Sequence, residues 1–229
     1  MTTFSDKRIT ARREIPRPDR ATWAALVGAS TSMLSDGQGR RGALDAELRA
    51  VTAATRFTGP ALTVQCRPGD NLTALAALEW VRPGDVVVLA NGGHTGAALI
   101  GGNYAAMAKA RGAVAVVCDA PARDLDELDA LGLPVFARGA IPAGPMKTSP
   151  GTIGFPVAVG AVSSASGDIL VGDRDGVVVV RQQEIAGAIA GYEGVCAREA
   201  GMSETIGTGS VPGWLAELIA KVGIDRIDE

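Results

Sequence analysis

Six short apolar runs, most of them rich in valine and alanine, are spread along the chain between helical and glycine-rich stretches. Runs of this length and composition favour β-strands. Because several are nearly continuous in valine, we expect these strands to be covered on both faces. The predicted strands are residues 61–66, 85–90, 113–118, 133–138, 156–162 and 176–181.

Between and around these runs, apolar residues recur with the three- to four-residue spacing of amphipathic helices. The first such stretch ends at the glycines of SDGQGRRG, which favour a stop. Residues 8–19 are rich in charge and proline, and we expect them to be flexible. The pattern predicts one layered α/β domain with a C-terminal helix. The predicted helices are residues 22–35, 72–80, 103–111, 183–199 and 214–222.

Composition adds limits to this picture. A chain of 229 residues that is 47% hydrophobic can bury one sizeable core. Lys and Arg number 22 against 25 Asp and Glu, a net charge of -3, so we expect no nucleic-acid partner. No apolar run is long enough to span a bilayer, and no apolar region follows the basic N-terminal stretch. We therefore expect a soluble, cytoplasmic protein without a membrane partner.

The cysteines point to the same compartment. Cys66, Cys118 and Cys196 are odd in number, widely spaced and free of any CxxC pattern. Such cysteines are typical of reduced thiols that serve in packing.

The stretch AVAVVCDAPARDLDEL, residues 113–128, joins a predicted strand to a polar turn. Ligands bind outside the carboxyl ends of strands in open α/β sheets. In this turn Arg123 offers a guanidinium fork for a carboxylate or carbonyl oxygen, and Asp124 offers a hard oxygen ligand for a divalent cation. On the dipeptide alone, a solvated ion pair in a surface loop is the simpler interpretation.

The glycine-dense loop NGGHTGAALIGGN, residues 91–103, also lies between a predicted strand and a predicted helix. Backbone N–H groups at a helix start can hold a carboxylate or phosphate, although these glycines also fit close chain packing. His94 in this loop is the sole histidine, and no G-x-S-x-G accompanies it. We interpret it as a loop histidine, and the histidine count excludes a histidine-rich zinc site.

Residue spacing also decides whether the chain contains a calcium loop or a nucleotide-binding motif. GDILVGDRDGVVVV, residues 167–180, lacks the ligand spacing of a calcium loop and predicts a β-hairpin with its turn at DRDG. Neither GxGxxG nor GxxxxGK[ST] occurs in the sequence, which disfavours a nucleotide cofactor.

Taken in order, several segments between residues 21 and 207 resemble the 4-hydroxy-4-methyl-2-oxoglutarate aldolase family, also called RraA-like after its ribonuclease-regulator members. The resemblance implies an α/β fold, a layered α/β/β/α sandwich of the swivelling-domain type. It makes residues 1–20 an N-terminal extension and residues 208–229 a C-terminal helical tail. The segments are SMLSDGQGRRGALD, RFTGPALTVQCRPGDN, VRPGDVVVLANGG, GGNYAAMAKARGAVAVVCDAPARD, LPVFARG and SGDILVGDRDGVVVV.

The resemblance implies a lyase that depends on Mg2+ or Mn2+ and releases pyruvate from small oxo acids. Such an enzyme acts as a 4-hydroxy-2-oxo acid aldolase, an oxaloacetate decarboxylase or both. It implies a homotrimer or homohexamer with sites at subunit interfaces.

The resemblance also assigns site residues. Asp124 would ligate the metal, and Arg123 would hold the carbonyl or enolate oxygen of the pyruvyl unit. Asp119 would match a catalytic strand-end aspartate, and Glu199 would match an acid that reaches a neighbouring subunit's site. The amides of Asn103 and Tyr104 would hold the substrate carboxylate. The full substrate-binding set is Gly101, Gly102, Asn103, Tyr104 and Arg123.

This chain departs from the family pattern at two places. Gly102 stands where the family has an acid that positions the water used in proton transfer. General acid–base help is commonly worth about 10²- to 10⁴-fold, so its loss would impair aldol cleavage more than decarboxylation. Asn103 or His94 would be left to hold a water there. The turn before Arg123 also reads DAPARD instead of D-G-x-x-R-D, which affects substrate preference more than metal binding.

Two alternatives stay open. The first is a non-catalytic binding protein like the ribonuclease-regulator branch, which tends to lose the aspartate that Asp124 retains here. The second is a diverged lyase or isomerase that uses the same enolate platform for another substrate.

Overall fold

A mixed sheet of nine strands dominates the computed structural model, which describes residues 8–225. Its centre is parallel: β3 (Phe57–Gln65), β4 (Val86–Ala90), β5 (Ala115–Cys118) and β6 (Val135–Ala137) pair in this order. Every residue of β4 and β5 is buried, as the valine-rich runs predicted.

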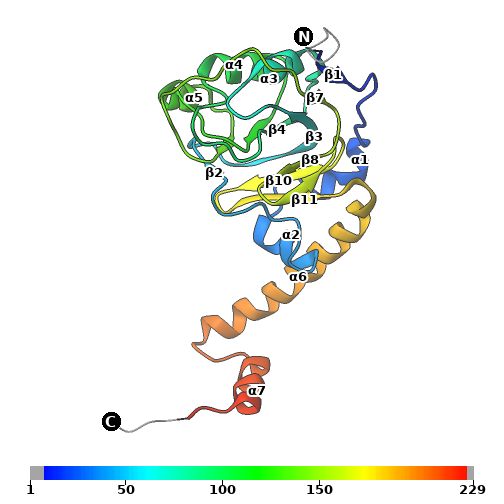
Figure 1. Ribbon diagram of the computed structural model, residues 1–229. Helices are drawn as coiled ribbons and strands as arrows, with labels where there is room; N and C mark the ends of the chain where they lie inside the picture. The colour runs from blue at the N-terminus through cyan, green and yellow to red at the C-terminus, as the bar shows by residue number, and fades with distance from the viewer. Residues whose placement is uncertain (1–7, 226–229) are drawn as a thin grey trace, which may run out of the picture.

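One layer of helices covers the first face of these strands (Figure 1). It consists of α3 (Leu72–Ala77), continued by the short turn η3 (Leu78–Trp80), α4 (Gly102–Ala110) and α5 (Leu125–Leu131). The core between helices and strands includes Leu62, Leu89, Tyr104 and Leu128. Each helix links two neighbouring parallel strands, so the loops after β3, β4 and β5 meet at one edge.

A second β layer packs on the other face. Strand β10 (Ile169–Asp173) pairs antiparallel with the first half of β3 and with β11 (Gly176–Val180), so β3 belongs to both layers. Residues alternate along β11: Val177 and Val179 join the core between the layers, and Val178 and Val180 face the other way. The hairpin predicted at DRDG is confirmed by the pairing of Asp173 with Gly176.

The fourth layer is helical and consists of α1 (Arg20–Trp23), α2 (Thr31–Gly37) and α6 (Ile185–Gly207). Helices α2 and α6 touch through backbone at two glycines. A Cβ at Gly37 would lie 2.6 Å from the Tyr192 nitrogen, and one at Gly191 would lie 2.8 Å from the Gly37 carbonyl carbon. Three core clusters thus separate four layers, which confirms the predicted α/β/β/α sandwich.

The outer part of α6 and the short α7 (Gly213–Val222) extend away from the layered body, on the side opposite α4 and α5 (Figure 1). The helix predicted at residues 214–222 is therefore confirmed. Among the described residues, no helix is long and apolar enough to cross a bilayer. We call residues 208–225 the arm. Its exposed large apolar side chains are Val211, Trp214, Leu218, Ile219, Val222 and Ile224.

Two predicted elements are wrong, each because of left-handed backbone. The single helix expected at residues 22–35 is divided into α1, η2 (Ala24–Leu26) and α2, because Val27 is extended and Gly28 has φ 76°. The strand expected at residues 156–162 is a hairpin of β8 (Val157–Val159) and β9 (Val162–Ser164). Gly160 and Ala161, with φ 50° and 62°, form its turn.

The segment expected to be flexible packs against the body instead. Strand β1 (Thr10–Ala11) pairs parallel with β7 (Thr152–Ile153), which also pairs with β3. Arg17 donates to both oxygens of the buried Asp85 at 2.7 Å. Residues 1–7 of the predicted extension and 226–229 of the predicted tail lie outside the described residues. The remaining short strand, β2 (Arg49–Ala50), pairs antiparallel with β6.

Candidate functional site

Arg123 and Asp124 lie in the loop between β5 and α5, next to the start of α4. Backbone hydrogen bonds join the two loops, from Leu99 N to Pro121 O at 2.9 Å and from Arg123 N to Ile100 O at 3.1 Å. Asp124 has the left-handed conformation, φ 59° and ψ 45°, which Asp adopts more readily than most residues. The Asp124 carboxylate accepts a hydrogen bond from the Gly102 amide at 3.2 Å and lies 3.5 Å from Arg123 Nε.

Gly101 and Gly102 leave the space that these side chains occupy. A Cβ at Gly101 would lie 3.0 Å from Arg123 Cγ and 3.2 Å from Asp124 Cγ. A Cβ at Gly102 would lie 2.8 Å from Glu127 Cβ and 3.0 Å from the Glu127 carboxyl carbon. The glycine pair therefore admits side chains from the loop and first turn of α5.

The N-terminus of α4 completes this arrangement. The Gly102 amide donates to Asp124, whereas the amides of Asn103 and Tyr104 have no acceptor within the helix, and Gly101 at the N-cap position has no side chain to accept from them. Such an end carries a partial positive charge that favours anions. The Tyr104 side chain is buried, burial raises the pKa of its phenol, and its hydroxyl has no partner among the described residues. Tyr104 can therefore serve the site through its backbone.

The residues present fit a divalent metal only if most of its ligands are waters and substrate oxygens. Asp124 presents a carboxylate whose side chain is 36% exposed. Among the side chains that the structure describes, no group of three or more His, Cys, Asp or Glu could hold a metal ion. Mg2+ is usually held by one or two carboxylates, with waters and substrate oxygens as its other ligands. The donor set fits that pattern and excludes a cage made of this chain's described residues.

Asp119 belongs to a different ion cluster. It accepts from Arg138 Nε at 2.6 Å and from the Gly93 amide at 2.9 Å. Arg138 also donates to Asp45 at 2.8 Å and to Glu47 at 2.6 Å. Burial lowers the pKa of Arg138, but its hydrogen bonds to Asp119 and Asp45 outweigh this and raise it. The pKa of Asp45 is lowered, chiefly by its hydrogen bond to Arg138. A catalytic role for Asp119 stays a prediction.

Sequence reasoning missed Arg138, Asp45 and Glu47. They come from distant parts of the chain and form no local motif. A pocket of about 430 Å³ lies beside them, lined by Glu47, Arg49, Ala50, Val51, Thr95, Arg138 and Gly139.

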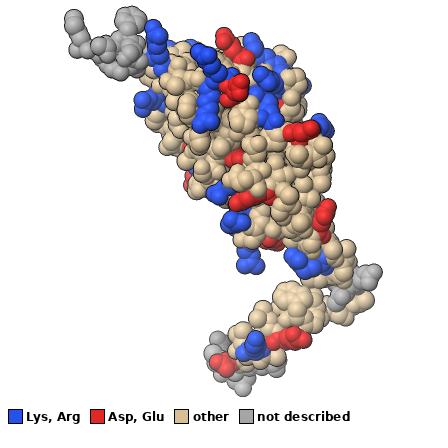
Figure 2. Space-filling view, turned by 90° about the vertical axis from the view of Figure 1, so that its right-hand side faces the viewer, with Lys and Arg blue, Asp and Glu red and all other residues tan. Residues whose placement is uncertain are grey.

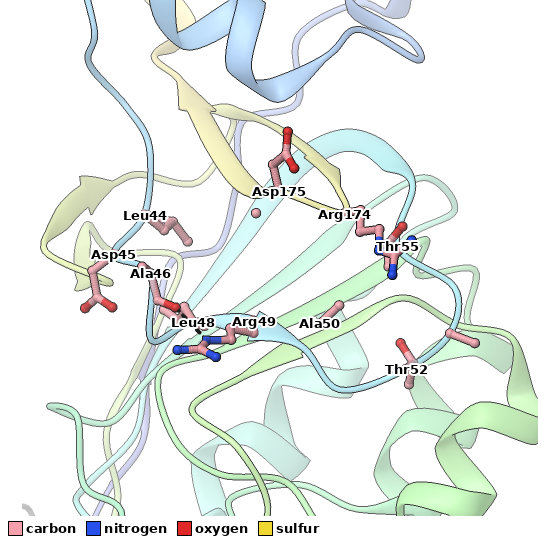
Figure 3. A pocket seen from close by; sticks show the side chains of 12 residues that line it. Leu44, Asp45, Ala46, Leu48, Arg49, Ala50, Thr52, Thr55, Arg174 and Asp175 are labelled. Carbon is pink, nitrogen blue, oxygen red and sulfur yellow. Dashed lines mark hydrogen bonds between the residues drawn. The ribbon is translucent and has the colours of Figure 1, made fainter.

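A pocket of about 690 Å³ lies between residues 44–55 and the β10–β11 turn. Figure 3 shows Arg49, Asp175 and Arg174 around it. Neither this pocket nor the one beside Arg138 is lined by Arg123 or Asp124. We place the candidate site at Arg123 and Asp124 because charged side chains meet the amides of a helix start there, whereas neither pocket is lined by the first turn of a helix. In the single chain this site is open, with 43% of the Arg123 side chain exposed.

Two other predicted residues lie apart from this site. Glu199 is exposed in the outer part of α6, which runs away from α4 and α5 (Figure 1). The structure therefore does not bring Glu199 to Arg123 within one chain, and its role in a neighbouring subunit's site stays a prediction. His94 is held by a hydrogen bond from its amide to Asn91 Oδ1 at 3.2 Å, and its ring lies against Gly69 and Gly96.

Comparisons with known proteins place the chain in a family. The RraA-like family model, described as Aldolase/RraA, matches residues 25–179. A Halalkalibacterium halodurans protein named "Putative 4-hydroxy-4-methyl-2-oxoglutarate aldolase" is 37% identical over 150 residues, 66% of this chain and 71% of its own length.

Solved structures of similar fold support the same family assignment. An uncharacterized protein from Pseudomonas syringae has a TM-score of 0.77 and 26% identity, covering 89% of this chain and 96% of its own. The RNA-processing inhibitor RraA from Thermus thermophilis has a TM-score of 0.62 and 30% identity, covering 66% of this chain and 92% of its own. With its four-layer fold and a family match that spans most of that fold, this chain belongs to the RraA-like family.

Proposed function

We propose that the protein is a divalent-metal-dependent carbon–carbon lyase that releases pyruvate from small oxo acids. Its reaction is cleavage of 4-hydroxy-2-oxo acids, decarboxylation of oxaloacetate, or both. One observation carries the proposal: Arg123 and Asp124 converge on the N-terminus of α4, at Gly101 and Gly102. The name of the H. halodurans relative supports it.

Each part of the site has a task in binding. The amides of Asn103 and Tyr104 would hold the substrate carboxylate at the positive end of α4. Asp124 would hold Mg2+ or Mn2+ together with waters and substrate oxygens. Arg123, whose Nε lies 3.5 Å from the Asp124 carboxylate, would direct its guanidinium at the 2-oxo oxygen.

The same groups suit the bond cleavage. When the bond to C3 breaks, its electron pair moves toward C2 and negative charge develops on the 2-oxo oxygen. The fixed positive charge of Arg123 stabilises that oxygen better in the transition state than in the ground state. When bound, the metal supplies Lewis-acid stabilisation of the same charge. No step requires a Schiff-base lysine.

We propose further that the protein works as a homotrimer or homohexamer, with Glu199 of one chain completing the site of another. The exposed apolar residues of the arm, such as Trp214 and Leu218, support a contact between chains. Light scattering should give three or six times the chain mass of 23.3 kDa. A monomer would contradict this assembly.

The alternative function is a non-catalytic binding protein, which the name of the T. thermophilis neighbour favours. Acidic and basic side chains are interspersed on the face shown in Figure 2, which supports a small-molecule substrate more than a polyanionic partner. A diverged lyase or isomerase that uses the same groups is the third candidate.

Binding of oxalate, which mimics the pyruvate enolate, distinguishes the two enzyme functions from the non-catalytic binding protein. Calorimetry should detect oxalate binding in the presence of Mg2+, and EDTA should abolish it. Asp124→Asn should also abolish it, whereas Asp175→Asn, which changes an exposed aspartate at the β10–β11 turn, should bind normally. Absence of Mg2+-dependent binding by the unaltered protein would favour the binding-protein alternative.

A further inference from the structure

We propose that Glu127 is the acid–base residue of this site and takes the place that Gly102 leaves open. The inference rests on the proposed function, which it deepens. In the family pattern the proton-transfer acid stands at the position of Gly102, on α4. In this chain a carboxylate from the first turn of α5 reaches the same place.

The argument starts from space. A Cβ built on Gly102 would lie 2.8 Å from Glu127 Cβ and 3.0 Å from its carboxyl carbon, so it would overlap the glutamate side chain. Gly102 is buried, and the backbone there cannot move away without disturbing α4. Position 102 and position 127 therefore compete for one volume. A side chain at 102 excludes the present position of Glu127, and Glu127 in its present position requires glycine at 102.

Hydrogen bonding distinguishes the two carboxylates of the site. Asp124 is engaged, because its Oδ2 accepts from the Gly102 amide and faces Arg123 Nε. For Glu127, no hydrogen bond or ion pair is recorded with any residue in the described part of the chain. Asp124 is thus fixed by its neighbours, as a metal ligand should be, whereas Glu127 keeps its lone pairs for a proton or a water.

The other acids of α5 do not share this position. Asp129 Oδ1 accepts from the Ala53 amide at 2.6 Å, which turns it toward residues 52–55. Asp126 is exposed, and it is not among the atoms nearest to a Cβ at Gly101 or Gly102. Because neighbouring helix positions are about 100° apart, Asp126 and Glu127 point in different directions. Asp126 is therefore a matched control.

The proton balance of aldol cleavage assigns the role. Glu127, directly or through one water, removes the proton from the C4 hydroxyl while the C3–C4 bond breaks and the enolate of pyruvate forms. The same proton then returns to C3 and gives pyruvate, so the carboxylate is regenerated. Oxaloacetate decarboxylation needs only the second transfer, because CO2 leaves without a hydroxyl proton being removed.

The first test needs no metal and no turnover. Gly102→Ala should lower the melting temperature of the metal-free protein by roughly 2–4 °C, because the new methyl group overlaps Glu127. In a Glu127→Ala background the same change should leave the melting temperature equal or higher. Equal effects in the two backgrounds would overturn the geometry on which the inference depends.

The second test follows proton transfer itself. With Mg2+ in D2O, NMR should show exchange of the pyruvate methyl protons in the unaltered protein. Glu127→Gln should slow both exchange and aldol cleavage on the order of 100-fold, with oxalate affinity unchanged. Asp126→Asn should behave like the unaltered protein. Placing the acid on α4 instead, in the double variant Gly102→Asp with Glu127→Ala, should restore exchange relative to Glu127→Ala alone.

The outcomes separate the two proposals. If the unaltered protein releases pyruvate and Glu127→Gln matches Asp126→Asn in both rates, the inference about Glu127 is wrong and the proposed lyase stands. If the unaltered protein neither releases pyruvate nor binds oxalate, the proposed function fails, and the inference fails with it.

Discussion

The side chain of Glu127 lies over Gly102, in the space where a side chain at position 102 would begin. At the preceding glycine, Gly101, the side chain of Asp124 occupies the corresponding space. Both carboxylates near the start of α4 therefore come from the loop and first turn of α5. This relationship explains why two successive glycines precede Asn103.

The space over Gly101 leads to a prediction about binding. In Gly101→Ala the new methyl group would contact Arg123 Cγ at 3.0 Å and Asp124 Cγ at 3.2 Å. We expect oxalate binding to be lost, because both site side chains must shift. Calorimetry on this variant and on Gly187→Ala, where nothing lies within 4 Å of the added atom, checks it. Equal affinities of the two variants would contradict the prediction.

The backbone of Asp124 predicts how its replacements differ in stability. Its φ of 59° is left-handed, which costs roughly 1–2 kcal/mol for an ordinary L-residue and less for Asp or Asn. We expect Asp124→Ala to be less stable than Asp124→Asn by about 1 kcal/mol in urea unfolding, although both remove the carboxylate. Identical unfolding midpoints would show that the backbone relaxes. Asp124→Asn is therefore the cleaner test of metal binding.

Arg123 is expected to act in the transition state rather than in binding alone. Removing one group that stabilises a developing oxyanion costs on the order of 10²- to 10³-fold in kcat. We expect Arg123→Lys to lower kcat by such a factor, because an ammonium lacks the planar fork of the guanidinium. Steady-state kinetics with oxaloacetate measure it. Arg174→Lys, at the exposed β10–β11 turn, is the control, and a change confined to KM would contradict the assignment.

Asp70 predicts a pH-dependent contribution to stability. This buried carboxylate accepts from the amides of Leu72, Thr148 and Ser149 at 2.9, 2.7 and 2.8 Å. Burial raises the pKa of Asp70, but these hydrogen bonds outweigh burial and lower it. A lowered pKa means that the stabilisation is fully present above the ordinary Asp pKa of about 3.9 and is lost as pH falls through the folded-state value.

We therefore expect Asp70→Asn to lower the free energy of unfolding by about 2–3 kcal/mol at neutral pH. The difference from the unaltered protein should shrink as pH falls below about 4. Urea unfolding across this range measures the difference, with Asp126→Asn as an exposed control. A difference that stays constant with pH would show that the ionised carboxylate is not the cause.

The valine-rich runs predicted the central strands because burial on both faces leaves no polar positions in them. The hairpin at DRDG followed from its Asp-Gly turn. Gly28 and the pair Gly160–Ala161 were missed, because a left-handed residue changes the chain direction without altering the apolar spacing.

Within the site, the family resemblance assigned Arg123 and Asp124 to one site with Gly101 and Gly102, and the structure brings these residues together. The sequence could not reveal Glu127, because the overlap with Gly102 depends on how α5 packs against α4. The cluster of Arg138 with Asp45, Glu47 and Asp119 depends on long-range folding in the same way.

The central claim is that Asp124 and a divalent metal support release of pyruvate. The most direct measurement is pyruvate release from oxaloacetate and from 4-hydroxy-4-methyl-2-oxoglutarate, with Mg2+ and with EDTA, for the unaltered protein and Asp124→Asn. The account predicts release from at least one substrate that requires Mg2+ and is lost in the variant. No release from either substrate, or release that is indifferent to EDTA and to Asp124→Asn, would contradict it.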